Sequence, residues 1–116
     1  MHSRWAKIAF WGAVVVTLWF ALYPQPPQLL PTDKDQHVLA FGVLTVLALA
    51  AYGPERWLVA TIALATFGGA IELLQLIPVL HRDADVVDWL TDCAAIAVPT
   101  VMTLTLRRIM LARSGP

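Results

Sequence analysis

Four long runs of apolar residues, separated by short polar or proline-containing segments, dominate the pattern along this 116-residue chain. At a rise of about 1.5 Å per residue, a helix of about 20 residues crosses the roughly 30 Å hydrocarbon core of a bilayer. Each run has about that length, so the pattern predicts an all-α integral membrane protein, a four-transmembrane-helix bundle. The chain forms one predicted domain, residues 1–116, with helices at about 5–23, 33–52, 57–77 and 86–106.

Proline and glycine mark the connections between the apolar runs. The segment PQPPQLLP, residues 24–31, contains four prolines, which lack the backbone N–H that a helix interior requires. Gly53 and Pro54 end the second run, and Pro78 ends the third. We therefore expect loops at these three places, with the second helix beginning near Asp33.

The first run has a rival interpretation as a cleaved signal peptide, because Arg4 and Lys7 precede most of its apolar residues. No A-x-A-like cleavage site follows the run, and it is longer than the usual apolar stretch of about 7–15 residues in such peptides. An uncleaved membrane anchor is therefore the favoured interpretation.

Composition agrees with a membrane protein. The chain is 59% hydrophobic and only 14% charged, against about 25% charged residues in soluble proteins. The formal net charge is zero and the longest basic stretch is the pair Arg107 and Arg108, so we expect no nucleic-acid partner. Cys93 is the only cysteine, which excludes an internal disulfide and a zinc site made of several cysteines.

Lysine and arginine are distributed unevenly about the predicted spans. Six of the eight basic residues fall on the side that carries both chain ends, and only Lys34 and Arg82 fall on the other side. The six are Arg4, Lys7, Arg56, Arg107, Arg108 and Arg113. Because cytoplasmic segments carry an excess of these residues, we expect both termini to face the cytoplasm.

Acidic residues show the opposite distribution. Seven of the eight map to the outer side: Asp33, Asp35, Glu72, Asp83, Asp85, Asp88 and Asp92. Three pairs, spaced three or four residues apart, each occupy one helical face: Asp33 with His37, Glu72 with Gln75, and Asp88 with Asp92. If these faces point inward, the bundle has an outward-opening acidic pocket that also receives Arg82. These seven paired or basic residues are the candidate ligand-binding residues.

Glu72 is the most informative of them. A carboxylate near the centre of a span costs about 2.5–3.5 kcal/mol on insertion scales, so Glu72 should face neighbouring helices rather than lipid. Arg82 is the expected counter-ion, because its guanidinium group can bind a carboxylate or phosphate through two parallel hydrogen bonds. Ordinary structural roles stay open: a hydrogen bond of Glu72 to Gln75 or to a neighbouring helix, and an interface hydrogen bond for His37.

Capping is a further structural interpretation for the acids near helix starts. Thr32 or Asp33 fits the N-cap of the second helix. Asp85 with Asp88 fits the N-cap and first turn of the fourth helix, where carboxylates offset the helix dipole. The glycine pair Gly68 and Gly69 is most simply a close helix-packing face.

The acidic side chains outnumber their basic partners in the predicted pocket. Either some carboxyls are protonated, or a cation or a cationic ligand completes the site. A carboxylate-rich site with little nitrogen and no thiolate suits a hard cation, so a divalent ion such as Mg²⁺ is the expected cofactor type. The candidate metal ligands are Glu72, Asp88 and Asp92.

Taken in order, these residues resemble the signature of the VanZ-like family of small bacterial membrane proteins. The resemblance covers residues 33–92 and comprises three motifs: D-K-x-x-H (Asp33, Lys34, His37), E-x-x-Q (Glu72, Gln75) and R-x-A-D-x-x-D (Arg82, Ala84, Asp85, Asp88). The chain departs from the family where asparagine usually follows the last aspartate and a glycine follows soon after. Here Asp92 adds a negative charge, and Ala95 and Ile96 follow.

The resemblance implies a multi-pass protein of the bacterial inner membrane whose signature residues face outward. The family's namesake is associated with low-level resistance to the glycopeptide teicoplanin, which implies a role at the cell envelope. The leading hypothesis is therefore binding of a membrane lipid or lipid-linked envelope precursor in the acidic pocket.

Two other functional classes stay open. In an intramembrane enzyme, Glu72 would be the general acid or base, His37 its proton partner, and Arg82 would stabilise developing charge. The chain has no G-x-S-x-G or H-E-x-x-H motif, so such an enzyme would use water. The third class is an accessory subunit or proton-coupled component, acting as a homo-oligomer or with another membrane protein.

Overall fold

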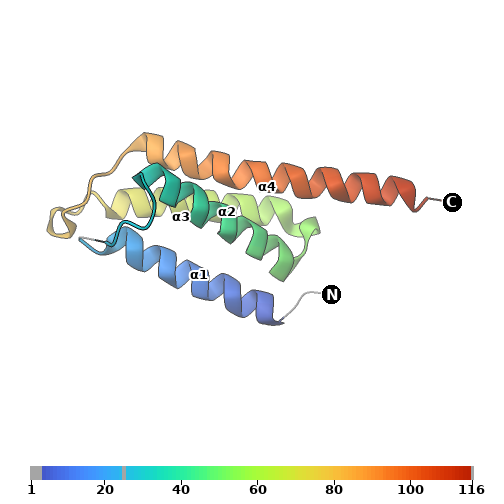
Figure 1. Cartoon of the computed structure of the whole chain (residues 1–116), viewed down its shortest axis with the longest axis horizontal. Helices are drawn as coiled ribbons and strands as arrows, with labels where there is room; N and C mark the ends of the chain where they lie inside the picture. The colour runs from blue at the N-terminus through green and yellow to red at the C-terminus, as the bar shows by residue number, and fades with distance from the viewer. Residues whose placement is uncertain (1–3, 25, 116) are drawn as a thin grey trace.

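The computed structural model describes residues 4–24 and 26–115, which form four long helices and two short 3₁₀ turns (Figure 1). In chain order these are α1 (Arg4–Leu22), α2 (Asp33–Tyr52), η1 (Pro54–Arg56), α3 (Trp57–Leu74), η2 (Pro78–Leu80) and α4 (Val86–Arg113). The described residues contain no strand, and all four long helices are long and apolar enough to cross a membrane. The all-helical prediction is confirmed. Residues 1–3 and 116 of the predicted domain, and Gln25 of the predicted 24–31 loop, lie outside the described residues.

The bounds of α2 and the start of α4 agree with the sequence prediction, because local signals fix them. Thr32 is the N-cap of α2, where its hydroxyl accepts a hydrogen bond from the Asp35 N–H at 3.1 Å. Asp85 caps α4 in the same way, accepting from the Val87 N–H at 2.9 Å. Gly53 ends α2 with φ of 94°, a conformation that glycine adopts readily.

The predicted ends of α3 and α4 are wrong by several residues. Helix α3 ends at Leu74 rather than Ile77, because the chain tightens into short turns before Pro78. Helix α4 continues to Arg113 rather than Leu106. The apolar run stops near Leu106, but the following residues are good helix formers, so hydropathy underestimates the length of the helix.

The helices pack into an elongated bundle with extents of 60 × 28 × 25 Å. Helix α2 packs most extensively against α4 and α1, and α3 packs against α4. The core between them contains Phe41, Leu44, Leu64, Ile71 and Ile96.

The α1–α2 and α3–α4 connections meet at one end of the bundle (Figure 1). We call this the polar end, comprising residues 20–24, 26–37 and 72–92. The opposite, distal end holds the start of α1 and the α2–α3 connection, and the last turns of α4 project beyond it.

Candidate functional site

The polar end holds a cluster of charged side chains between α2 and α4. His37 on α2 contacts Asp92 on α4, with 2.7 Å between Nδ1 and Oδ1. Its other ring nitrogen, Nε2, lies 3.8 Å from Oδ2 of Asp88. Lys34, one turn before His37, places Nζ 3.1 Å from Asp88 Oδ1 and 3.7 Å from Asp85 Oδ2. Four contacts therefore join the first turns of α2 to the N-cap and first turns of α4.

Glu72 joins the cluster from α3. Its side chain is buried, and Oε2 accepts a hydrogen bond from the backbone N–H of Asp85 at 3.0 Å. The carboxylate therefore faces the N-terminus of α4, where the exposed N–H groups and the helix dipole favour negative charge. This agrees with the prediction that Glu72 faces neighbouring helices.

One oxygen of Glu72 and one of Asp92 have no hydrogen-bond partner among the described residues. These atoms are Oε1 of Glu72 and Oδ2 of Asp92, and both are buried. Leaving a buried polar atom without a partner costs about 1–3 kcal/mol, and more where the group is charged. The two carboxylates are therefore held at some expense of stability.

Arg82 was the expected counter-ion of the carboxylates, but its hydrogen bonds go to α1 instead. Its Nη1 donates hydrogen bonds to the carbonyl oxygens of Phe20 and Ala21, both at 2.9 Å, and of Tyr23 at 3.1 Å. These carbonyls belong to the C-terminus of α1, where the last four have no partner within the helix and carry partial negative charge. Arg82 therefore caps α1, and among the described residues it is Lys34 that pairs with the carboxylates of Asp85 and Asp88.

Gln75 also faces α1 rather than Glu72. Its Nε2 donates to the carbonyl oxygen of Ala21 at 2.8 Å, and the side chain is buried. The expected hydrogen bond between Gln75 and Glu72 required both to share one face of a continuing helix. Because α3 ends at Leu74, the Gln75 side chain turns toward α1 instead.

The cluster contains two groups of side chains with spacing suited to a metal ion. His37, Glu72 and Asp92 form one group, and Asp33, His37 and Asp88 form the other, each with ligand atoms within 4.8 Å of one another. The structure thus regroups the expected metal ligands, because Asp88 lies with Asp33 rather than with Glu72. His37 belongs to both groups, so each group includes an imidazole nitrogen.

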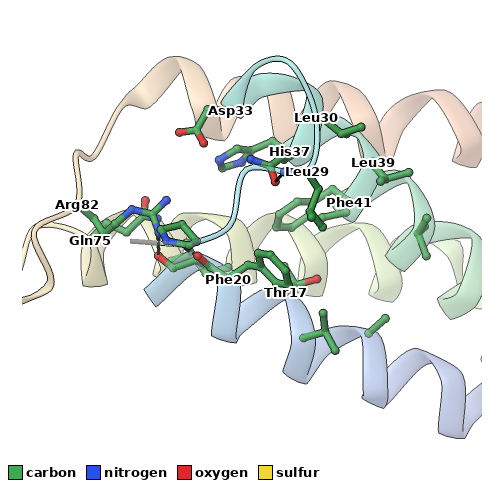
Figure 2. A pocket seen from close by; sticks show the side chains of 18 residues that line it. Thr17, Phe20, Leu29, Leu30, Asp33, His37, Leu39, Phe41, Gln75 and Arg82 are labelled. Atoms are coloured by element: carbon green, nitrogen blue, oxygen red, sulfur yellow. Dashed lines mark hydrogen bonds between the residues drawn. The ribbon is translucent and has the colours of Figure 1, made fainter. Parts of the chain in front are cut away.

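A cavity of about 290 Å³ lies between α1, α2 and the connection that joins them. Figure 2 shows Asp33 and His37 on its α2 side, with Arg82 and Gln75 beside the end of α1. The apolar lining includes Ala13, Val16, Phe20, Leu39, Ala40 and Val43. The polar lining at one end comprises Asp33, Gln36, His37, Gln75 and Arg82. The cavity is therefore amphipathic along its length.

A broader hollow of about 810 Å³ lies over α3 and the start of α4. Glu72 and Trp89 line it, and Trp89 Nε1 donates to the carbonyl oxygen of Ala65 at 2.9 Å. His37 lines the α1–α2 cavity and Glu72 lines this hollow. The charged cluster therefore lies between the α1–α2 cavity and the hollow over α3.

Two residues that shape the site were named in the sequence but were not among the candidate site residues. Lys34 lies one turn from His37, and its place in the D-K-x-x-H motif could have indicated it. Gly68 on α3 packs so closely against α4 that a Cβ atom there would lie 2.9 Å from Asp92 Oδ2. The expected close-packing role of Gly68 agrees with this distance, but the identity of its neighbour has no local sequence signal.

Comparison of the chain with protein-family models, curated proteins and solved structures finds no match in any of the three.

Proposed function

We propose that this chain is a four-span membrane protein that binds an amphipathic lipid or lipid-linked precursor, with the polar head at the polar end. The hydrocarbon chain of the ligand lies along the α1–α2 cavity. The observation that carries the proposal is the amphipathic lining of that cavity: apolar along the helices and polar at one end. Ligand sites are typically concave and mostly apolar, with a few polar groups that orient the ligand.

Membrane insertion is supported by the outer surface of the bundle. All four long helices expose large apolar side chains, among them Val15 on α1, Val46 on α2, Val59 on α3 and Val98 on α4. An apolar surface that surrounds a bundle is typical of helices packed in lipid. The arginines of η1 and the end of α4 lie at the distal end together with the start of α1, which supports a cytoplasmic location for that end.

The proposed head group carries a phosphate near Arg82. The three hydrogen bonds from Arg82 to α1 all use Nη1, and a guanidinium group carries further N–H donors on Nη2 and Nε. These donors can bind phosphate oxygens in pairs. The carboxylate of Asp33 and the ring of His37, across the cavity, select a head group that also carries hydrogen-bond donors or positive charge.

Native mass spectrometry of the detergent-purified protein tests this proposal. The wild type retains a co-purified lipid of one mass class, and Ala40→Trp, which fills the cavity, loses it. Ala63→Trp is the matched control, because Ala63 is exposed on α3 and lies outside the cavity lining. Equal lipid occupancy in all three proteins, with each folded by circular dichroism, would overturn the proposal.

A second candidate, an intramembrane enzyme that acts on the same lipid, is favoured by the contact between His37 and Asp92. An imidazole oriented by a buried carboxylate is a common arrangement for a general base. His37 also lines the cavity, within reach of a bound head group. Conversion of the co-purified lipid to a product of different mass over many turnovers, lost in His37→Gln, would favour the enzyme over simple binding.

The cell-envelope role is proposed from the resemblance to the VanZ-like family, which stays a prediction. It places the protein in a bacterial inner membrane and links it to teicoplanin-type resistance. Expression of wild type and Ala40→Trp in a glycopeptide-sensitive bacterium checks the link. A wild-type increase in the inhibitory teicoplanin concentration that Ala40→Trp lacks supports it, and no increase with either protein counts against it.

A further inference from the structure

We propose that His37, Glu72 and Asp92 bind a single divalent transition-metal ion, of the zinc type, between α2, α3 and α4. The three side chains can each place one ligand atom within 4.8 Å of the other two. This inference does not rest on lipid binding: His37 lines the α1–α2 cavity, but Glu72 and Asp92, which supply the two unpartnered oxygens, lie outside its lining.

The two buried carboxylate oxygens without hydrogen-bond partners point to a ligand at this position. Glu72 is 8% exposed and Asp92 is 0% exposed, and each has one oxygen that accepts no hydrogen bond from the described residues. Buried polar atoms in proteins nearly always have a partner. A metal ion accepts electron pairs from both oxygens at once, which a single protein donor does not.

The remaining oxygen of each carboxylate is held in place. Oε2 of Glu72 accepts from the backbone N–H of Asp85, and Oδ1 of Asp92 contacts His37 Nδ1. The hydrogen bond from Asp85 orients the Glu72 carboxylate, as outer hydrogen bonds commonly do for metal ligands. His37 Nδ1, which lies against the Asp92 carboxylate, would exchange its contact with Asp92 Oδ1 for a bond to the ion.

Gly68 gives Asp92 the room for this arrangement. A Cβ atom at Gly68 would lie 2.9 Å from Asp92 Oδ2 and 3.4 Å from two ring carbons of Phe41. Gly68 and Glu72 are four residues apart on α3, so they lie on the same helical face. Asp92 Oδ2 therefore points at the face of α3 that carries Glu72.

The donor set favours a zinc-type ion over Mg²⁺. One imidazole with two carboxylates is a combination that zinc accepts, whereas magnesium sites use oxygen ligands. Three protein ligands leave a fourth position open, as in zinc sites that bind water or a substrate. The inclusion of His37 is what separates this site from the magnesium site expected from the sequence.

Local charge also favours a cation. Five carboxyl groups meet at the polar end, and Lys34 and His37 are the basic side chains that contact them. The five are Asp33, Glu72, Asp85, Asp88 and Asp92. Lys34 contacts Asp85 and Asp88, so its charge is directed at the outer carboxylates rather than at Glu72.

Metal titration of the full chain in detergent, after removal of bound metals with a chelator, tests the site. Isothermal titration and native mass spectrometry with Zn²⁺ should show one ion per chain, with Mg²⁺ binding much more weakly. Asp92→Asn and His37→Gln should each weaken Zn²⁺ binding by more than about 100-fold, because loss of an outer partner alone costs about 10–100-fold. Asp35→Asn is the matched control, since Asp35 is an exposed acid on α2 outside both groups.

A gain of signal keeps the test decisive if these variants fold poorly. Zinc-type sites accept thiolate ligands, so His37→Cys should add a sulfur-to-cobalt charge-transfer band when Co²⁺ is bound. The wild type, which has the same Cys93, should lack that band. No Zn²⁺ binding by the wild type, equal binding by Asp92→Asn, or no cobalt band in a folded His37→Cys protein would each overturn the proposal.

Discussion

Two buried threonine hydroxyls in the distal part of the bundle bond within their own helices, whereas at the polar end several buried side chains contact another helix. Thr45 on α2 donates to the carbonyl of Phe41 at 2.7 Å, and Thr100 on α4 donates to that of Ile96 at 2.8 Å. Each hydroxyl bonds four residues back in its own helix. Such groups place no condition on how the helices pack.

At the polar end, the contacts of His37, Glu72 and Gln75 each join two different parts of the chain. His37 and Asp92 join α2 to α4, Glu72 joins α3 to the start of α4, and Gln75 joins the end of α3 to α1. These contacts therefore fix the positions of the helices relative to one another. Among the described residues, the unpartnered buried atoms at the polar end are two carboxylate oxygens from neighbouring helices, whereas in the distal part the unpartnered atom is the hydroxyl of Thr61. The pair of carboxylates marks the polar end as the place for a ligand.

The largest expected loss of stability comes from a core substitution that should leave ligand binding intact. Leu44 is completely buried in the core, and Leu44→Ala should lower the free energy of unfolding by about 2–5 kcal/mol. Because Leu44 lies outside both metal groups and the cavity lining, Zn²⁺ and lipid binding should survive in the protein that remains folded. Denaturant unfolding and native mass spectrometry measure the two properties. Loss of both together would show that the two regions do not act separately.

The second largest loss of stability is expected at Gly68, where α3 packs closely against α4. Gly68→Ala should destabilise the protein by about 1–3 kcal/mol, because the added methyl meets Asp92 Oδ2 and the Phe41 ring. Gly42→Ala is the matched control on α2, since a Cβ atom there meets nothing within 4 Å. That change should stabilise the helix by up to about 1 kcal/mol. Thermal unfolding of both variants measures the difference, and equal shifts would contradict the close approach of α3 and α4.

Removing the cap on α1 should have a smaller effect. Arg82→Met removes three hydrogen bonds to the end of α1, and because the side chain is partly exposed, water replaces some of them. We expect a loss of about 1–2 kcal/mol of stability. Hydrogen exchange should rise at Phe20 and its neighbours more than at residues in the middle of α4. Uniform exchange along the chain would argue against a local capping role.

The smallest effects are expected in the distal part. Thr45→Val and Thr100→Val replace a hydroxyl that bonds only within its own helix, so each should change stability by less than about 1 kcal/mol. Denaturant unfolding checks both. A large loss in either variant would mean that these hydroxyls also serve contacts between helices.

The sequence predicted the parts of the fold that depend on local signals. Helix α2 begins and ends where the threonine cap and Gly53-Pro54 place its limits, because capping and chain-breaking residues act over a few positions. The end of α4 could not be predicted from hydropathy. Hydropathy detects the apolar run, and the helix continues beyond that run to Arg113. The proximity of Glu72, His37 and Asp92 was expected from helical spacing and the cost of exposing a carboxylate to lipid.

The partners of Arg82 and Gln75 were beyond sequence reasoning. Both side chains bind backbone carbonyls at the end of α1, which any sequence supplies equally. Charge alone suggested that Arg82 would pair with a carboxylate. The position of α1 decided otherwise, and that position results from packing of the whole bundle.

The most direct test of lipid binding is to locate the bound hydrocarbon chain by NMR. The protein, with protonated methyl groups on valine and leucine in a deuterated background, is studied in deuterated detergent with its protonated co-purified lipid. All four of Val16, Val43, Val59 and Val98 are exposed, but only Val16 and Val43 line the α1–α2 cavity. We expect cross-peaks from the lipid chain protons to Val16 and Val43 and none to Val59 and Val98. Cross-peaks of equal strength to all four valines, or to Val59 and Val98 alone, would contradict the account.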